Sequence, residues 1–181
     1  MGNSAAEMLI NFSQSLPGIQ TFIVVIFAAI GVVLVGSAIA TYYLEGSNMS
    51  SMRRSSVFAI AMKVIFGSQC LALPWLLDTV AGTFFTETDT LYVESGVPLD
   101  ADIKIAALMT IVNLLAVIGF IAGGRGLLTL ANGPVNQQPG WIGTGFTLIG
   151  VGAILTNFYI AADYIARSFG MGALGTEYFK F

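Results

Sequence analysis

The sequence predicts an all-α membrane protein made of two tandem transmembrane helical hairpins, four spans in all, plus a short N-terminal amphipathic helix. The 181 residues are 56% hydrophobic and only 9% charged, with a mean hydropathy of +0.83, a composition typical of integral membrane proteins. Residues 20–44 contain no charge, and at ~1.5 Å per residue such a helix crosses the ~30 Å hydrocarbon core of a bilayer. A second apolar stretch of similar sequence, residues 109–132, follows later in the chain.

The repeat has an offset of 88 residues and continues without a gap into the next apolar segment. It sets Gln69 opposite Asn157 in the second helix of each half. Identical pairs include Ile23 and Ile111, Ala28 and Ala116, Gly31 and Gly119, Gly36 and Gly124, and Phe58 and Phe146. A fixed period is the signature of internal duplication, so the predicted building block is one hairpin present twice.

Residues 1–17 form the first predicted element. Ser4 and Glu7 have capping-box spacing, and apolar residues follow at helical intervals. We expect a short helix in the membrane interface that ends at Pro17, because proline cannot donate a backbone hydrogen bond.

Hairpin 1 occupies residues 18–85, with spans at about 18–44 and 56–85. The second span is long for one crossing, which favours tilting or protrusion. Pro74 lies within it and predicts a kink.

An acidic loop, residues 86–102, precedes hairpin 2. That hairpin occupies residues 103–168, with spans at about 103–131 and 141–168, and residues 169–181 form a tail.

Loop charges orient the spans. Arg53 and Arg54 follow span 1 and Arg125 lies near the end of span 3, and Lys and Arg concentrate on the cytoplasmic side of membrane proteins. The sequence therefore predicts that the Arg53-Arg54 turn is cytoplasmic, whereas both termini and loop 86–102 are external.

Composition also argues against several kinds of site. The chain has no histidine and one cysteine, which excludes His-based acid/base chemistry, His/Cys metal centres and an internal disulfide. A net charge of −3 gives no indication of a nucleic-acid-binding surface. We expect a protein that is not an enzyme and has no cofactor.

Two groups of residues are candidates for assembly. Small residues spaced four apart allow close approach of helices in lipid, either within a hairpin or between subunits. They are Gly36, Ala40, Gly119, Ala122, Gly123 and Gly126. Basic residues toward one membrane side could line the lumen or cytoplasmic face of an assembly of many copies. They are Arg53, Arg54, Lys63 and Arg125.

Polar residues within the spans are the third group. Gln69, Asn113 and Asn157 are predicted near mid-membrane, where interhelical hydrogen bonding is the simpler interpretation. Together with Asp78 they could instead form the polar track of a channel or transporter. Asp163 and Arg167 are four residues apart, acid first, the spacing of a helical ion pair.

The arrangement of an external N-terminus, a glycine-containing span, a basic cytoplasmic turn and a returning span resembles the pilins of type IV conjugation systems. Two such units in one chain resemble the small multi-pass components of type IVB secretion and conjugation systems, the IcmC/DotE/TraQ group. The resemblance implies a bacterial inner-membrane protein that can be extruded into an extracellular pilus, with Arg53 and Arg54 facing a lumen. It also implies structural phospholipid between subunits.

The expected function is therefore a structural subunit that oligomerises with itself into a conjugative pilus or membrane tube. Its other partners would be membrane lipid and further secretion-system subunits, with single-stranded DNA or protein only as passing cargo. The alternatives are a small channel or transporter, or an accessory subunit of a larger membrane complex.

Overall fold

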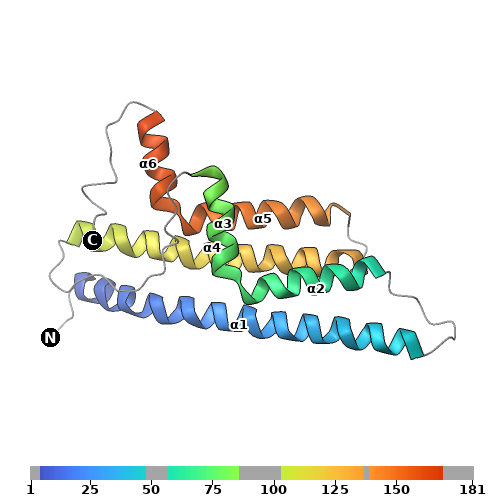
Figure 1. Cartoon of the computed structure of the whole chain (residues 1–181). Coiled ribbons are helices and arrows are strands. Elements are labelled where there is room, and N and C mark those ends of the chain that lie inside the picture. The colour runs from blue at the N-terminus through green and yellow to red at the C-terminus, as the bar shows by residue number, and fades with distance from the viewer. Residues whose placement is uncertain (1–4, 48–56, 86–102, 137–138, 169–181) are drawn as a thin grey trace.

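The computed structural model describes residues 5–47, 57–85, 103–136 and 139–168, and this part of the chain is all-helical (Figure 1). Its helices are α1 (Ala5–Ser47), α2 (Val57–Leu71), α3 (Leu73–Phe84), α4 (Ile103–Asn136), α5 (Trp141–Thr156) and α6 (Phe158–Ser168). The all-α prediction is confirmed. The acidic loop, the tail and the Arg53-Arg54 turn lie outside the described residues.

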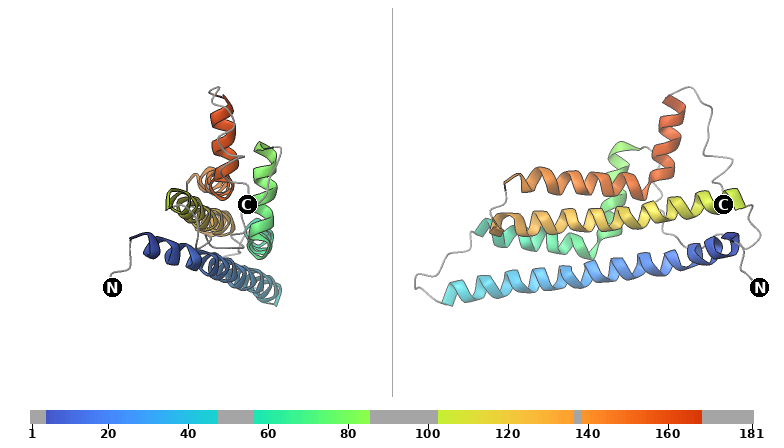
Figure 2. Two further views of the ribbon diagram at one scale, coloured as in Figure 1. Left: turned by 90° about the vertical axis from the view of Figure 1, so that its left-hand side faces the viewer. Right: turned by 180° about the vertical axis from the view of Figure 1, so that it is seen from behind.

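Four of the helices run side by side. α1 and α4 point in the same direction, and α2 and α5 run back along them (Figures 1 and 2). α3 and α6 leave this bundle on the same side, each directly after a break in the chain (Figure 2). Each half of the chain is therefore one long helix followed by a broken one, which is the arrangement expected of a tandem duplication.

The first break separates α2 from α3. Ala72 has φ −111° and ψ 31°, outside the helical region, and the two helices meet at 93°. Pro74 lies in the first turn of α3, where its missing N–H costs no intrahelical hydrogen bond. The kink predicted from Pro74 is therefore present, and it is sharp enough to divide the predicted span 56–85 into two helices.

The second break separates α5 from α6 and is not marked by a proline. Asn157 has φ −112° and ψ 32°, nearly the values at Ala72. The predicted continuous span 141–168 is therefore also two helices. The sequence prediction missed this break because it relied on proline as the signal.

The breaks also refine the repeat. Ala72 and Asn157 are structural counterparts at an offset of 85, three residues shorter than the offset of 88 that relates α1 to α4. At 85, identical pairs in the second helices are Gly67 and Gly152, Asp78 and Asp163, and Ala81 and Ala166. The three missing residues fall in the turn between the helices of the second half. In the structure Gln69 is thus not opposite Asn157.

Close glycine contacts join the helices within each half. A Cβ on Gly31 would lie 2.5 Å from the carbonyl oxygen of Gly67, and a Cβ on Gly119 would lie 2.8 Å from that of Gly152. These are equivalent crossings, α1 with α2 and α4 with α5. Lipid supplies no hydrophobic force between helices, so backbone proximity of this kind is what holds them together.

The two halves share one apolar core. Phe27 of α1, Leu73 and Leu77 of α3, and Phe120 and Leu127 of α4 are all buried in it. Because this core is made by α1, α2, α3, α4 and α5 together, the halves form a single packed unit.

α1 does not end at Pro17. It continues through the proline and is 43 residues long in total. The boundary predicted at Pro17 for a separate helix over residues 1–17 is therefore wrong. Ser13, Leu16 and Gln20 are all at most 1% exposed and lie on one helical face that passes Pro17 without interruption. Tertiary packing of this face maintains the helix across a residue that weakens it locally.

Two helices are long and apolar enough to cross a membrane, α1 over Asn11–Leu44 and α4 over Thr110–Asn136. The bent pair α2–α3 adds a third candidate if it is counted as one span. α5 is apolar but has only 16 residues. The described residues therefore contain two to three candidate spans, and a membrane protein is the class that they fit.

Candidate functional site

The small residues singled out in the sequence divide into two groups. Gly119, Gly123 and Gly126 of α4 lie in tight contacts with Gly152, Leu77 and Gly145, respectively, and Ala122 is half-buried. Gly36 and Ala40 of α1 are exposed, and a Cβ on Gly36 would meet nothing within 4 Å. The α4 set therefore packs helices within the chain, whereas the α1 pair belongs to an uncovered surface.

The uncovered surface of α1 is extensive. Only 17% of its most apolar window is buried, compared with 56% for α4. Large apolar side chains along this helix are exposed, among them Phe22, Val25, Val32, Val33 and Ile39. In a membrane such a surface contacts lipid or other protein chains.

Basic residues lie toward one end of the bundle. The start of α2, the end of α4 and the start of α5 meet there, since Trp141 packs against both Phe58, with ring centroids 6.5 Å apart, and Gly133. Arg125 is exposed and lines a shallow pocket of about 240 Å³ with Asn132 and Asn136.

Lys63 of α2 is half-buried. At ~1.5 Å of rise per residue, Arg125 and Lys63 are within about 12 Å of the level where Trp141 lies. These two cations therefore lie toward the same end of the bundle.

The polar residues collect at the helix breaks. Asn157 and Thr156 are fully buried at the α5–α6 break. Asn157 Nδ2 donates to Ala153 O at 3.1 Å and to Thr156 Oγ1 at 3.3 Å, and Thr156 Oγ1 donates to Gly152 O and Ala153 O, both at 3.0 Å. Asn157 Oδ1 accepts no hydrogen bond from the described residues.

The α2–α3 break has a similar character. Gln69 lies one turn before Ala72, and Asp78 lies in α3. Gln69 Oε1 and Asp78 Oδ1 are buried atoms that likewise accept no hydrogen bond within the described part of the chain. An unpaired buried oxygen is costly, so both breaks offer acceptors to a donor or cation from outside the chain.

The remaining predicted residues fall elsewhere. Asn113 is 8% exposed on α4. Asp163 and Arg167 both lie in α6, but their side chains are outside the described residues. Among the described residues no group of three or more His, Cys, Asp or Glu could hold a metal ion.

Sequence reasoning missed Phe27 and the Gly31–Gly67 contact. The pairing of Gly31 with Gly119 in the repeat was a signal for the latter, because Gly119 already belonged to a small-residue motif. Phe27 had no such signal, since one phenylalanine in an apolar span looks like any other.

Comparison with known proteins gave no match to a protein-family model, to a curated protein or to a solved structure. The residues and contacts described above are therefore the basis for a proposed function.

Proposed function

We propose that this chain is a non-enzymatic structural subunit of a type IV, type IVB-like, conjugation or secretion apparatus, and that many copies assemble into a pilus or a membrane-embedded tube in the bacterial inner membrane. The observation that carries the proposal is the uncovered apolar surface of α1. A helix with this much exposed apolar area, including the open Gly36, is suited to contact neighbouring subunits and the lipid between them.

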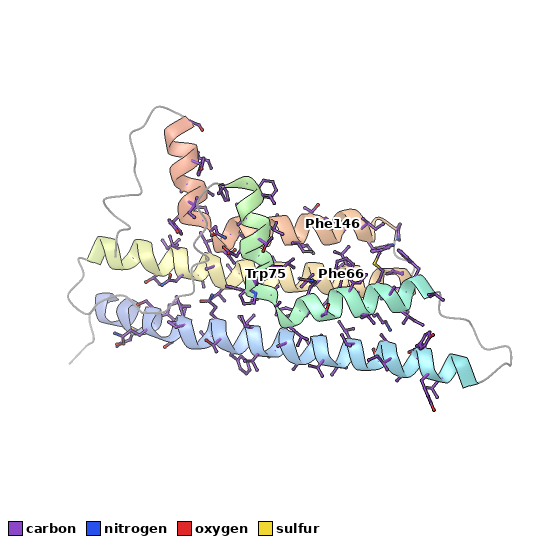
Figure 3. All side chains as sticks on the ribbon, in the orientation of Figure 1. Phe66, Trp75 and Phe146 are labelled. Carbon is purple, nitrogen blue, oxygen red and sulfur yellow. The ribbon has the colours of Figure 1, made fainter. Side chains whose placement is uncertain are left out.

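The proposal includes four membrane crossings. α2 and α5 have 15 and 16 residues, or about 22–24 Å at ~1.5 Å per residue, somewhat less than the ~30 Å core. In the proposed arrangement the perpendicular helices α3 and α6 lie along the external interface. Trp75 and Tyr164 support this placement, because they are 64% and 41% exposed and such aromatic side chains favour the headgroup region. Figure 3 shows Trp75 at the start of α3.

In this orientation the end of the bundle near Trp141 is cytoplasmic. Lys63 and Arg125 lie toward it, and the chain between α1 and α2 adds Arg53 and Arg54. A ring or tube of many copies would gather these cations around its inner or cytoplasmic side, where they could contact the phosphates of passing single-stranded DNA.

A charge reversal tests this proposal. Replacing Arg53 and Arg54 together with Glu should lower DNA or protein transfer, or the yield of sheared filaments, in cells that depend on this chain. The matched control replaces Glu87 and Asp89 of the acidic loop with Lys, which changes the charge by the same amount on the opposite side. Unchanged transfer and filament yield in the arginine variant would overturn the proposal, provided that both variants reach the membrane equally.

A second candidate function is a small channel or transporter, and the helix breaks favour it. Broken helices that present polar groups are typical of substrate sites in transporters. The buried atoms Asn157 Oδ1, Gln69 Oε1 and Asp78 Oδ1 all lie at or near the two breaks without a hydrogen-bond donor in the described residues. Flux of a monovalent cation through proteoliposomes, abolished by Asn157→Leu but kept by Ser68→Leu at the exposed Ser68, would establish it.

A further inference from the structure

One face of α1 has an equivalent in α4 with the opposite exposure. The outer stripe consists of exposed residues of α1 at alternating intervals of three and four: Phe22, Val25, Ala29, Val32, Gly36 and Ile39. The inner stripe consists of their counterparts at the offset of 88 on α4: Thr110, Asn113, Val117, Phe120, Gly124 and Leu127, all of them buried. Intervals of three and four keep each stripe on one face of its helix.

The inner stripe is on the side of α4 that meets the first half of the chain. The ring of Phe27 lies against Gly124, and Leu73 and Leu77 join Phe120 and Leu127 in the core. α1, the end of α2 with Cys70 and the start of α3 thus form a covering face, and α4 carries the surface that is covered. Figure 2 shows α4 between α1 and α5, while α1 lies at the edge of the bundle.

The second half of the chain has its own covering face, and no described residue of the chain is covered by it. Leu115 is the counterpart of Phe27, and it is only half-buried where Phe27 is 7% exposed. Phe158, at the offset of 85, is the counterpart of Leu73, and it is 36% exposed where Leu73 is fully buried. One chain therefore has an uncovered stripe at one end and an unused covering face at the other.

We propose that the outer stripe of α1 docks on the face that α4, α5 and the start of α6 form in a second copy of this chain, repeating between copies the contact that joins the two halves within one copy. Leu115 of one copy packs over Gly36 of the next, as Phe27 packs over Gly124. The contact is heterologous, so it propagates into a closed ring or an open filament according to its rotation angle. This inference rests on the proposed self-assembly and specifies the surfaces that mediate it.

Lipid is the other possible cover for the outer stripe, and the repeat argues against it. Val33 is exposed on α1 and its counterpart Ile121 is exposed on α4, so that position faces lipid in both halves. The stripe positions differ, since each is exposed on α1 and buried on α4. Gly36 also favours a protein neighbour, because an open glycine leaves room for a side chain from another helix.

Cysteine cross-linking in native membranes tests the contact. In a Cys70→Ala background, Gly36→Cys and Leu115→Cys are placed on two co-expressed, differently tagged copies and treated with a short bifunctional thiol reagent. We expect a cross-linked heterodimer, and a ladder of higher species when both cysteines are on one chain. Ser37→Cys replaces Gly36→Cys in the matched control, because Ser37 is at the same depth but its counterpart Arg125 is exposed. The control should give at least tenfold less product.

The pair Phe27→Cys and Gly124→Cys on one chain should cross-link without a ladder, and this product reports that the fold is intact. Cross-linking of Gly36→Cys to itself would show a symmetric α1 contact and overturn the inference while leaving self-assembly in place. Equal yields from Ser37→Cys and Gly36→Cys would also overturn it. A folded protein that gives no product and sediments as a monomer in native-membrane nanodiscs would overturn both the inference and the proposed assembly.

Discussion

The ring of Phe27 on α1 lies against Gly124 on α4, in the space that any side chain on residue 124 would occupy. This contact joins helices from the two halves of the chain, 97 residues apart in sequence by their numbers. The two surfaces are complementary because the ring on α1 fills the space that the missing Cβ leaves on α4. The two halves are therefore joined by an asymmetric contact, since Gly36, the residue of α1 at the offset of 88 from Gly124, is open.

We expect Gly124→Ala to destabilise the fold by about 1–3 kcal/mol, the usual cost of inserting a methyl group into a filled core. Gly150→Ala is the control, because a Cβ there would meet nothing within 4 Å. Unfolding in mixed micelles can be followed by labelling of Cys70, which is fully buried and is the only cysteine. Adding Phe27→Leu to Gly124→Ala should restore part of the loss. Additive destabilisation by the two changes would show that they do not share a contact.

Gly119→Ala should destabilise the protein at least as much as Gly124→Ala. The added Cβ would lie 2.8 Å from Gly152 O and 2.9 Å from Thr156 N, and backbone atoms cannot move aside as a side chain can. The consequence is separation of α4 from α5, seen as faster thiol labelling of a cysteine placed at buried Ala153. Gly143→Ala, an open position on α5, should leave that labelling rate unchanged; a change of similar size in both variants would refute the glycine contact as its cause.

The all-α membrane class could be predicted from the sequence because it depends only on the composition and length of the uncharged segments. It does not depend on which residues of two helices face each other. Pro74 likewise marked the α2–α3 break, because proline is favoured in the first turn of a helix and so signals where a new helix begins. The α5–α6 break had no such mark, because Asn157 allows the same backbone conformation without forcing it. The continuation of α1 through Pro17 depends on the buried face of Ser13, Leu16 and Gln20, which no local pattern reveals.

The candidate site was predictable only in part, for a related reason. Residue types indicated which side chains carry charge or allow close packing, but the covering of a helix face depends on which neighbours reach it. Gly36 and Gly124 are identical in type and in repeat position, yet one is open and the other is filled by Phe27. An ungapped offset of 88 also concealed the shorter turn of the second half, and so it paired Gln69 with Asn157.

Pro74→Ala should leave the α2–α3 bend in place. The α5–α6 break has Tyr159 at the equivalent position and bends without proline, so packing rather than the pyrrolidine ring holds the geometry. Spin labels on the exposed Val57 and Phe84 report it. With ~1.5 Å of rise per residue, a straight helix separates the two backbones by about 40 Å and a right-angled bend by about 29 Å. A shift of the distance distribution toward the longer value in Pro74→Ala would show that proline is required.

Asn157→Ala should fold as stably as the natural chain if Asn157 is only a structural residue. The change removes two hydrogen bonds from Asn157 Nδ2, to Ala153 O and Thr156 Oγ1, which in a membrane average about 0.6 kcal/mol each. It also removes the buried Oδ1 that has no donor in the described residues, a relief of about 1–3 kcal/mol. Ala72 at the equivalent break shows that alanine fits this backbone. The measurement is the midpoint of unfolding in micelles, compared with Asn157→Asp, which keeps Oδ1 and replaces the donor Nδ2 with a second oxygen. A loss of stability above ~1 kcal/mol in Asn157→Ala would show that Oδ1 is paired with a bound donor, and it would shift the balance from the structural subunit to the channel or transporter.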